Sequence, residues 1–239
     1  MNVNSNAYTF GFAALMVVIV AAGLSAVATT LKPMQDENVE KEKMQNILSS
    51  IQINVSREEA AEIYNDYIIE QLVVSEGQLV DGVDAFSVDM VKEVRVENLE
   101  RNAPLYVAEK DGKTYYIIPL QGTGLWGPIW GYISLEEDLN TVYGAVFDHK
   151  AETPGLGAEI KFPVFTDQFP GKKVLDDDGS LLGIDVRKGG STTEYEVDGI
   201  SGGTITSDGV ELMILDCLES YFPFLNEYAG ATASAQLIN

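Results

Sequence analysis

The sequence predicts an α+β protein in which a single N-terminal transmembrane helix precedes one domain with a twisted antiparallel sheet flanked by helices. Three observations favour this architecture: a charge-free apolar stretch at the N-terminus, β-rich runs separated by turns in the middle, and a helical pattern near the C-terminus. We therefore expect an N-terminal tail and transmembrane helix over 1–33, a helical stalk or linker over 34–55, and a single folded domain over 56–239.

The N-terminal segment has the composition of a membrane span. Residues 1–31 contain no charged side chain, and the run from Phe10 to Leu31 is apolar or small throughout. About 20 such residues cross a bilayer as a helix. A cleaved signal peptide is the alternative, because Ala26 and Ala28 form a small-x-small pattern. We favour an uncleaved anchor, since no Lys or Arg precedes the run and the run is long for a signal peptide.

The elements of the folded domain are predicted from local patterns. A capping box from Ser56 to Glu59 indicates a helix that begins near Ser56, and apolar residues from Ala60 to Ile68 follow at helical spacing. From Pro104 onward the pattern becomes β-rich, and the pair Asp111–Gly112 predicts the turn of a hairpin. The later elements that we expect are strands over Gly131–Leu135 and Thr141–Phe147, a hairpin around Asp178–Gly179 that returns through Leu181–Val186, and a helix over about Ser207–Glu219.

Composition excludes several classes of function. The formal net charge is −22, from 37 acidic and 15 basic residues, and such a surface repels nucleic acid. The single cysteine, Cys217, excludes an internal disulfide and a cysteine-built metal site within this chain. The single histidine, His149, disfavours a histidine-based zinc site and a histidine-dependent triad. We therefore expect no metal site and no catalytic residue.

The stretch from Asp198 to Ser207 combines features that suit a phosphate. Gly202 and Gly203 lie directly before a helical pattern, and glycines let backbone amides come close to a bound group. The start of a helix adds unpaired N–H groups and a positive dipole end. Thr204 lies between the glycines and the predicted helix, so its hydroxyl would face the phosphate. A polar loop that ends in a helix cap explains the same residues equally well.

This stretch resembles the flavinylation motif of the FMN-binding domain family. The matching residues are Asp198, Ser201, Gly202, Gly203 and Thr204. In that family the last threonine of the motif carries FMN through a phosphoester, so the resemblance implies one covalent FMN on Thr204. Gly203 stands where the family usually has alanine, which is a small-for-small change. Ser201, Gly202, Gly203 and Thr206 are expected beside the cofactor, although Thr206 lies two positions past the attachment place.

Two glycine-rich turns are further candidates. Gly122–Gly127 formally matches GxGxxG, but Pro128 and strand-like residues follow it, so it is no dinucleotide fingerprint. Within it Trp126 either packs in the core or borders an aromatic cofactor, whereas Trp130 is expected in the core. Pro154–Gly155 fits the centre of a type II turn. In the FMN-binding domain family a Glu-Thr-Pro-Gly turn lines the flavin. The residues that we expect near the ring are Glu152, Thr153, Leu156, Gly157 and Trp126.

The order of these features resembles the C-subunit family of sodium-translocating NADH:quinone oxidoreductases. The segment Gly124–Gly127 favours this family over the G subunit of Rnf electron-transport complexes, which shares the threonine motif. The resemblance implies a chain that relays single electrons through FMN, while the other membrane subunits of the complex handle NADH, quinone and sodium. It also implies a flavin transferase that attaches the cofactor. The alternatives are a cofactor-free membrane-tethered scaffold and a free-standing flavin reductase.

Two arguments disagree about the side of the membrane on which the folded domain lies. Lys32, Lys41 and Lys43 follow the span, and no Lys or Arg precedes it, so the positive-inside rule leans towards a cytoplasmic domain. The resemblance instead implies a bacterial inner-membrane protein with its flavin domain on the periplasmic side, where the flavin transferase works. We expect the periplasmic side, because large domains translocate largely regardless of charge.

Overall fold

The computed structural model describes residues 5–226 and 228, and its chain divides into two units, 1–43 and 44–239. The first unit is formed by most of α1 (Asn6–Ser50), a helix that continues through Pro33. An 18-residue window of this helix has a mean hydropathy of 2.4 and no part of it is buried in the protein. By length and composition α1 can therefore cross a membrane.

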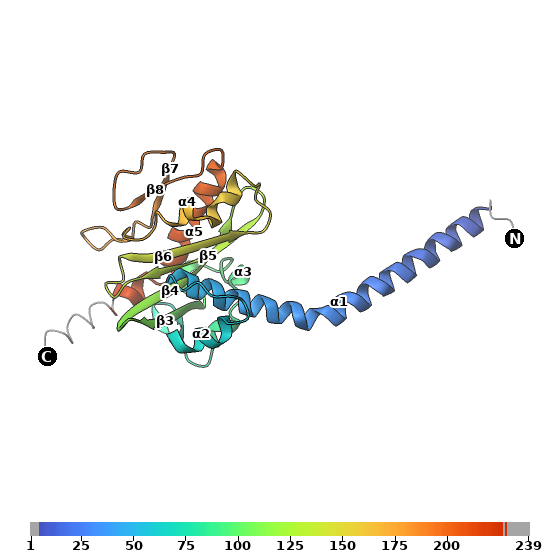
Figure 1. The fold of residues 1–239 in the computed structure, drawn as a ribbon, viewed down its shortest axis with the longest axis horizontal. Coiled ribbons are helices and arrows are strands. Elements are labelled where there is room, and N and C mark those ends of the chain that lie inside the picture. The colour runs from blue at the N-terminus through green and yellow to red at the C-terminus, as the bar shows by residue number, and fades with distance from the viewer. Residues whose placement is uncertain (1–4, 227, 229–239) are drawn as a thin grey trace. The chain divides into compact units, whose positions relative to one another are not determined.

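The second unit is built on a six-stranded sheet with the strand order β2-β1-β3-β4-β5-β6 (Figure 1). Each pair of neighbouring strands is antiparallel. The strands are β1 (Ile68–Ser75), β2 (Gln78–Leu79), β3 (Ala103–Lys110), β4 (Lys113–Thr123), β5 (Pro128–Leu135) and β6 (Val142–His149). The predicted antiparallel sheet is thus confirmed, with β6 at one edge.

The turn of the predicted hairpin has the expected chemistry. Lys110 pairs with Lys113 across the turn, and both central residues have positive φ, 53° at Asp111 and 74° at Gly112. A two-residue turn with positive φ at both positions matches the twist of the flanking strands. The next connection, between β4 and β5, pairs Thr123 with Pro128 and leads directly into a strand. The GxGxxG match is therefore a turn between strands, as expected.

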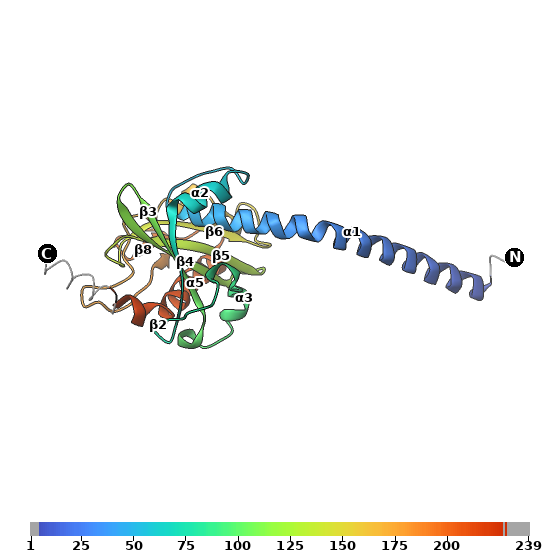
Figure 2. The ribbon, with the colours of Figure 1, turned by 90° about the horizontal axis from the view of Figure 1, so that it is seen from below.

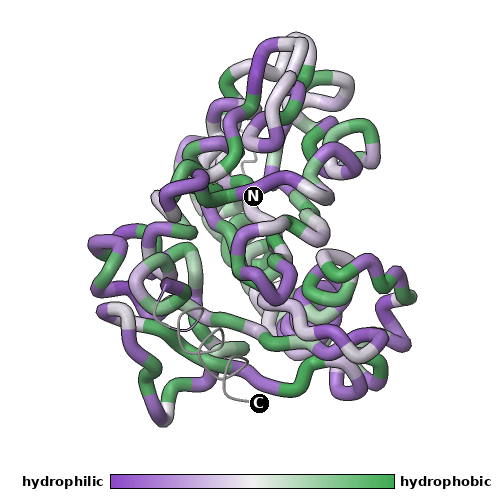
Figure 3. Tube along the Cα trace, turned by 90° about the vertical axis from the view of Figure 1, so that its left-hand side faces the viewer, coloured by the Kyte–Doolittle hydropathy of each residue, from purple (hydrophilic) through white to green (hydrophobic). Residues whose placement is uncertain are grey.

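Helices cover both faces of the sheet. On one face α5 (Thr204–Glu219) packs Val210, Ile214 and Leu218 into a core shared with the strands. On the other face α2 (Ala60–Tyr67) and the last turns of α1 contribute to a second core around Tyr106 (Figure 2). Hydrophobic and hydrophilic segments are interspersed along the trace (Figure 3), and the central strands β3 and β4 are buried along most of their length because both of their faces are covered.

The shorter elements lie in the connections. They are η1 (Ala85–Ser87), α3 (Met90–Glu93), η2 (Asn98–Glu100), η3 (Gly157–Lys161), α4 (Pro163–Thr166), β7 (Asp185–Arg187) and β8 (Glu196–Asp198). β7 and β8 form a separate two-stranded parallel sheet. This small sheet contacts α5 through β7. Along the chain, β8 is followed by the loop that ends at the start of α5.

The first predicted helix is shifted. The capping box forms as expected, because Ser56 Oγ donates to Glu59 Oε2 at 2.7 Å. However, α2 begins at Ala60, after a turn, and ends at Tyr67. Ile68, which we expected on the helix, begins β1 instead. β1 runs through several β-branched residues and pairs with β3 over most of its length, so long-range pairing overrides the helical spacing.

The second predicted hairpin is confirmed at its turn, but its predicted return strand, Leu181–Val186, is wrong. The turn at Asp176–Ser180 does close, and Leu175 and Leu181 form an isolated bridge beside it. The chain then leaves the extended conformation at Gly183, where φ is +72°. The expected return strand is replaced by β7, which pairs in parallel with β8 rather than with the segment before the turn.

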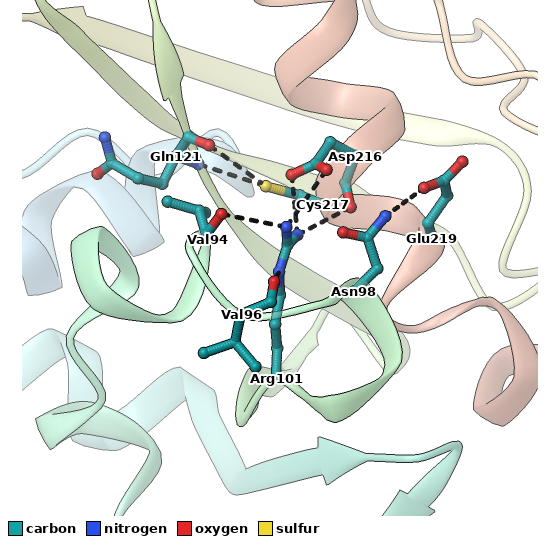
Figure 4. A network of polar contacts seen from close by, with 8 residues as sticks. All are labelled: Val94, Val96, Asn98, Arg101, Gln121, Asp216, Cys217 and Glu219. Carbon is teal, nitrogen blue, oxygen red and sulfur yellow. Dashed lines mark hydrogen bonds and ion pairs between the residues drawn. The ribbon is translucent and has the colours of Figure 1, made fainter.

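A buried arginine ties α5 to the segment that precedes β3 (Figure 4). Arg101 is 5% exposed, and its Nη1 lies 2.8 Å from Asp216 Oδ2. The same guanidinium donates to the carbonyl oxygens of Val94 and Val96. Beside it, burial raises the pKa of the Cys217 thiol to about 12, so this thiol is protonated at neutral pH and serves as a core residue.

Candidate functional site

Thr204 occupies the first position of α5. We expected the helix to begin near Ser207, but it begins three residues earlier, so Thr204 lies in its first turn rather than before it. The residue at the N-cap position is Gly203, so no side-chain hydrogen bond caps the helix and its N-terminus is uncapped. The first N–H groups of a helix have no partner within it. The N-terminus of α5 therefore presents backbone donors and a positive dipole end next to an exposed threonine.

The four hydroxyl residues of this stretch separate into two pairs. Thr206 and Ser207 are 1% and 3% exposed. Both of their hydroxyls have protein partners: Ser207 Oγ accepts from the backbone N–H of Ile200 at 3.0 Å, and Thr206 donates to a carboxylate. Ser201 and Thr204 are exposed. Only these two hydroxyls of the four are open to solvent.

Glu152 connects the three predicted segments. It is 5% exposed. Its Oε1 accepts from the backbone N–H of Trp126 at 2.8 Å, and its Oε2 accepts from Thr206 Oγ1 at 2.7 Å. A Cβ at Gly157 would lie 2.4 Å from both Oε2 of Glu152 and Oγ1 of Thr206, so only glycine fits there. The β4–β5 turn, the turn after β6 and the start of α5 thus meet at one buried carboxylate.

The turn after β6 has the predicted form. The backbone N–H of Leu156 donates to the carbonyl of Thr153 at 3.1 Å, and Gly155 has a φ of +76°, as a type II turn requires. Thr153 is exposed, and Leu156 is 41% exposed. Leu156 also lies against the threonine loop, because a Cβ on Gly202 would come within 2.7 Å of its Cδ2.

Positions 202 and 203 differ in how well they tolerate a residue other than glycine, and this difference can be tested. Gly202 has a φ of +76°, so Gly202→Ala is expected to destabilise the domain by about 1–2 kcal/mol through left-handed backbone strain. Gly203 has a φ of −110°, and its added Cβ would meet Ile200 at 3.1 Å and the backbone nitrogen of Gly157 at 3.2 Å, contacts that a shift of a few tenths of an ångström relieves. Gly203→Ala should therefore lower the melting temperature less than Gly202→Ala. Equal losses in thermal denaturation would contradict this assignment.

Exposed apolar side chains lie on the same segments. Trp126 is 65% exposed, so the interpretation that places it in the core is wrong. Trp130, which we expected in the core, is only half-buried and belongs to neither hydrophobic core of the described residues. Leu125 and Ile205, next to Trp126 and Thr204, are 49% and 57% exposed. Large exposed apolar groups near polar loops indicate a surface that binds a partner or a ligand. Their flat and branched side chains suit an aromatic ring system.

Two basic residues of this region were missed by the sequence analysis. Arg187 and Lys188 line a groove together with Ser201, Gly202 and Thr204. Arg187 is held by Asp185 at 2.8 Å and Glu196 at 3.2 Å. Lys188 forms no ion pair within the described part of the chain. The sequence shows only two adjacent basic residues, and the parallel pairing of β7 with β8 is what brings them to the threonine loop.

Asp198 supports the loop from outside the groove. Its Oδ1 accepts from the backbone N–H of Ser191 at 2.6 Å, and this hydrogen bond lowers the pKa of the carboxyl group. The carboxylate is thus directed at the preceding loop. His149 lies behind the turn after β6, where its Nδ1 accepts from the N–H of Glu152 at 3.2 Å. Its Nε2 is buried and has no hydrogen-bond partner among the described residues.

The donor set fits an FMN. An exposed hydroxyl, an uncapped helix N-terminus, a glycine at positive φ and a neighbouring lysine suit the phosphate. Exposed Trp126 and Leu156 offer apolar surface for the ring. The class that the fold and these residues define is an FMN-binding domain behind an apolar N-terminal helix. In agreement, the sequence model of the family described as FMN-binding domain matches residues 124–219.

Comparison with known proteins specifies the family. The chain is 33% identical to the C subunit of the Na(+)-translocating NADH-quinone reductase of Pasteurella multocida, over 86% of this chain and 88% of that protein. The corresponding protein of Neisseria meningitidis serogroup B is 30% identical, over 93% and 96%. This chain belongs to the family of the C subunits of Na(+)-translocating NADH-quinone reductases.

Solved structures agree. The crystal structure of the corresponding C subunit from Parabacteroides distasonis has a TM-score of 0.76 and 48% identity, and the match covers 82% of this chain and 96% of that one. The structure of NqrC from Shewanella oneidensis, at 24% identity and a TM-score of 0.67, supports the fold alone.

Proposed function

We propose that this chain is the FMN-bearing electron-transfer subunit of a sodium-translocating NADH:quinone oxidoreductase, with one FMN bound covalently to Thr204 through a phosphoester. The observation that carries the proposal is which hydroxyl groups of the motif are exposed and which are buried and hydrogen-bonded. Thr204 is exposed at the uncapped N-terminus of α5, whereas Thr206 and Ser207 are buried and hydrogen-bonded. Ser201 is exposed too, but it does not occupy the attachment place of the flavinylation motif.

The chain's own residues have distinct roles in this proposal. Thr204 Oγ1 supplies the oxygen of the phosphoester. The N–H groups and dipole of α5 stabilise the phosphate by about 0.3–1 kcal/mol, and Lys188 supplies a positive charge in the same groove. Gly202 has a positive φ and no side chain, so the backbone at this position can come close to the phosphate. Glu152 does not contact the phosphate, and it holds the β4–β5 turn and the start of α5 in place.

The ring would lie against the exposed surface of Leu156 and Trp126. When bound, FMN supplies one-electron chemistry, and the protein holds the ring and tunes its potential. The chain accepts an electron from one redox centre of the complex and passes it to another. The relatives are named as C subunits of an enzyme that translocates Na(+) and acts on NADH and quinone. We assign the binding of NADH, quinone and sodium to the other membrane subunits. A flavin transferase attaches the FMN.

The proposal is tested on the native membrane complex. After purification and denaturing electrophoresis, a band of 26.0 kDa is expected to fluoresce under ultraviolet light, because a covalent flavin survives denaturation. A peptide map is expected to place the flavin on the peptide that contains Thr204. A non-fluorescent band would favour the scaffold alternative. A fluorescent chain that purifies without other subunits would favour a free-standing reductase, and one that purifies with Rnf proteins would favour the G subunit of an Rnf complex.

We further propose that α1 anchors the chain in the bacterial inner membrane and that the flavin domain lies in the periplasm. The fluorescent band should stay in the membrane pellet after alkaline carbonate washing, because α1 holds an apolar span. Protease added to intact spheroplasts should remove the band, while a cytoplasmic marker protein stays intact. Protection of the band in intact spheroplasts, with digestion after lysis, would place the domain in the cytoplasm.

A further inference from the structure

β6 is an edge strand whose free side can be identified from the register. Ile129 pairs with His149, and the N–H of Lys150 donates to the carbonyl of Pro128 at 3.0 Å. In an antiparallel pair, the residues that bond to the neighbouring strand alternate with residues whose N–H and C=O point away from it. Residues 144, 146 and 148 therefore face β5, and Ala145 and Phe147 direct their backbone groups outward.

The two ends of this edge are closed, and the middle is open. At one end Val142 exchanges backbone hydrogen bonds with Gly171 and Lys172, both at 2.8 Å. At the other end the N–H of His149 donates to Asp148 Oδ1 at 2.8 Å. Between them, the outward backbone groups of Ala145 and Phe147 have no hydrogen-bond partner among the described residues. A row of unpaired backbone N–H and C=O groups on an edge strand is a template for pairing with another chain.

A groove of about 840 Å³ follows this stretch of the edge. Residues 144–148 line it, together with four residues of 46–54 and five residues of 161–170. Ala145 and Phe147 are only 7% and 5% exposed. The open hydrogen-bonding groups therefore lie on the floor of a groove rather than on a flat surface.

We propose that this groove binds an extended segment of another subunit of the complex, which adds to β6 as a seventh strand. The proposal rests on the proposed membership in the complex. Free donor–acceptor pairs at positions two residues apart match the repeat of a strand, which is how an added strand binds a sheet edge. Asp148 and Asp167 line the groove against a single Lys161, so the segment should carry a basic side chain. A second copy of this chain is a poor occupant, because two chains of net charge −22 repel each other.

Hydrogen exchange on the wild-type protein gives the first test. The full-length chain in detergent is compared with the intact membrane complex. The amides of Ala145 and Phe147 are expected to exchange roughly tenfold more slowly in the complex, because strand addition pairs them. The amide of Val146, which faces β5, is the internal reference and should be protected in both samples. Equal exchange at Ala145 and Phe147 in the two samples would overturn the proposal.

A proline gives the second test. Ala145→Pro removes one outward N–H and leaves the β5-facing hydrogen bonds in place, a position where an edge strand tolerates proline. The control, Ala145→Gly, keeps that N–H. Thermal denaturation is used to check that both variants are folded. Ala145→Pro should then lower the amount of fluorescent chain that purifies with the complex by about tenfold relative to Ala145→Gly.

The outcomes separate this inference from the proposed function. Normal recovery of Ala145→Pro would overturn the strand addition. Slow exchange at Ala145 and Phe147 in the isolated chain at high concentration, together with a dimer in light scattering, would identify a second copy of this chain as the occupant. That result would also overturn the proposed addition of a strand from another subunit. Failure of the wild-type chain to purify with any complex would instead contradict the proposed function.

Discussion

Thr204→Val is expected to abolish covalent flavin attachment while the chain still accumulates in the membrane. Valine is close to threonine in shape but lacks the hydroxyl that a phosphoester requires, and position 204 is exposed, so the fold should lose little stability. The measurement is in-gel flavin fluorescence after denaturation, from membranes of cells that contain the flavin transferase, with the amount of chain determined by immunoblotting. The fluorescence per chain should fall to background.

The neighbouring hydroxyls supply the controls. Ser201→Ala should keep the fluorescent band, since Ser201 is exposed but lies outside the attachment position. Thr206→Ser should also keep it, because serine retains the hydrogen bond to Glu152. Thr206→Val is a poorer control than the sequence alone suggests, since it leaves a buried carboxylate oxygen without its donor. A fluorescent Thr204→Val band, or a flavin mapped to Ser201, would contradict the assignment.

Features that depend on local sequence were predicted well. The Asp111–Gly112 turn, the type II turn at Pro154–Gly155 and the strand that follows Gly122–Gly127 are all dictated by glycine and proline conformations within a few residues. The apolar run of α1 required only composition. In each case the structural cause lies within one segment, so no knowledge of distant contacts was needed.

Features that depend on distant pairing were missed. Ile68 fits a helical spacing, and only its pairing partner in β3 makes it the start of a strand. Lys188 carries no motif, and the parallel pairing of β7 with β8 places it in the threonine groove. Thr206 has the sequence neighbourhood of a cofactor ligand, but its hydroxyl is directed to Glu152, which lies 54 positions earlier.

Glu152 gives the second prediction. Glu152→Ala would leave two groups without their acceptor, the backbone N–H of Trp126 and the hydroxyl of Thr206, in a site where the carboxylate is 5% exposed. Each unsatisfied buried group costs about 1–3 kcal/mol, so we expect a loss of about 3 kcal/mol in the free energy of unfolding. For a domain of this size that corresponds to a melting temperature lower by about 6–12 °C. Thermal denaturation of the full-length chain in detergent measures it.

Glu152→Gln is the matched control, because it separates hydrogen bonding from charge. The amide oxygen of glutamine can accept from the N–H of Trp126, and its NH₂ group can donate to the hydroxyl of Thr206, which rotates to accept. Glu152→Gln should therefore keep most of the stability and most of the fluorescent band, whereas Glu152→Ala should lower both, since the turn that carries Trp126 and the start of α5 lose their common partner. Equal losses for both variants would show that the negative charge, rather than the pair of hydrogen bonds, is what holds the three segments together.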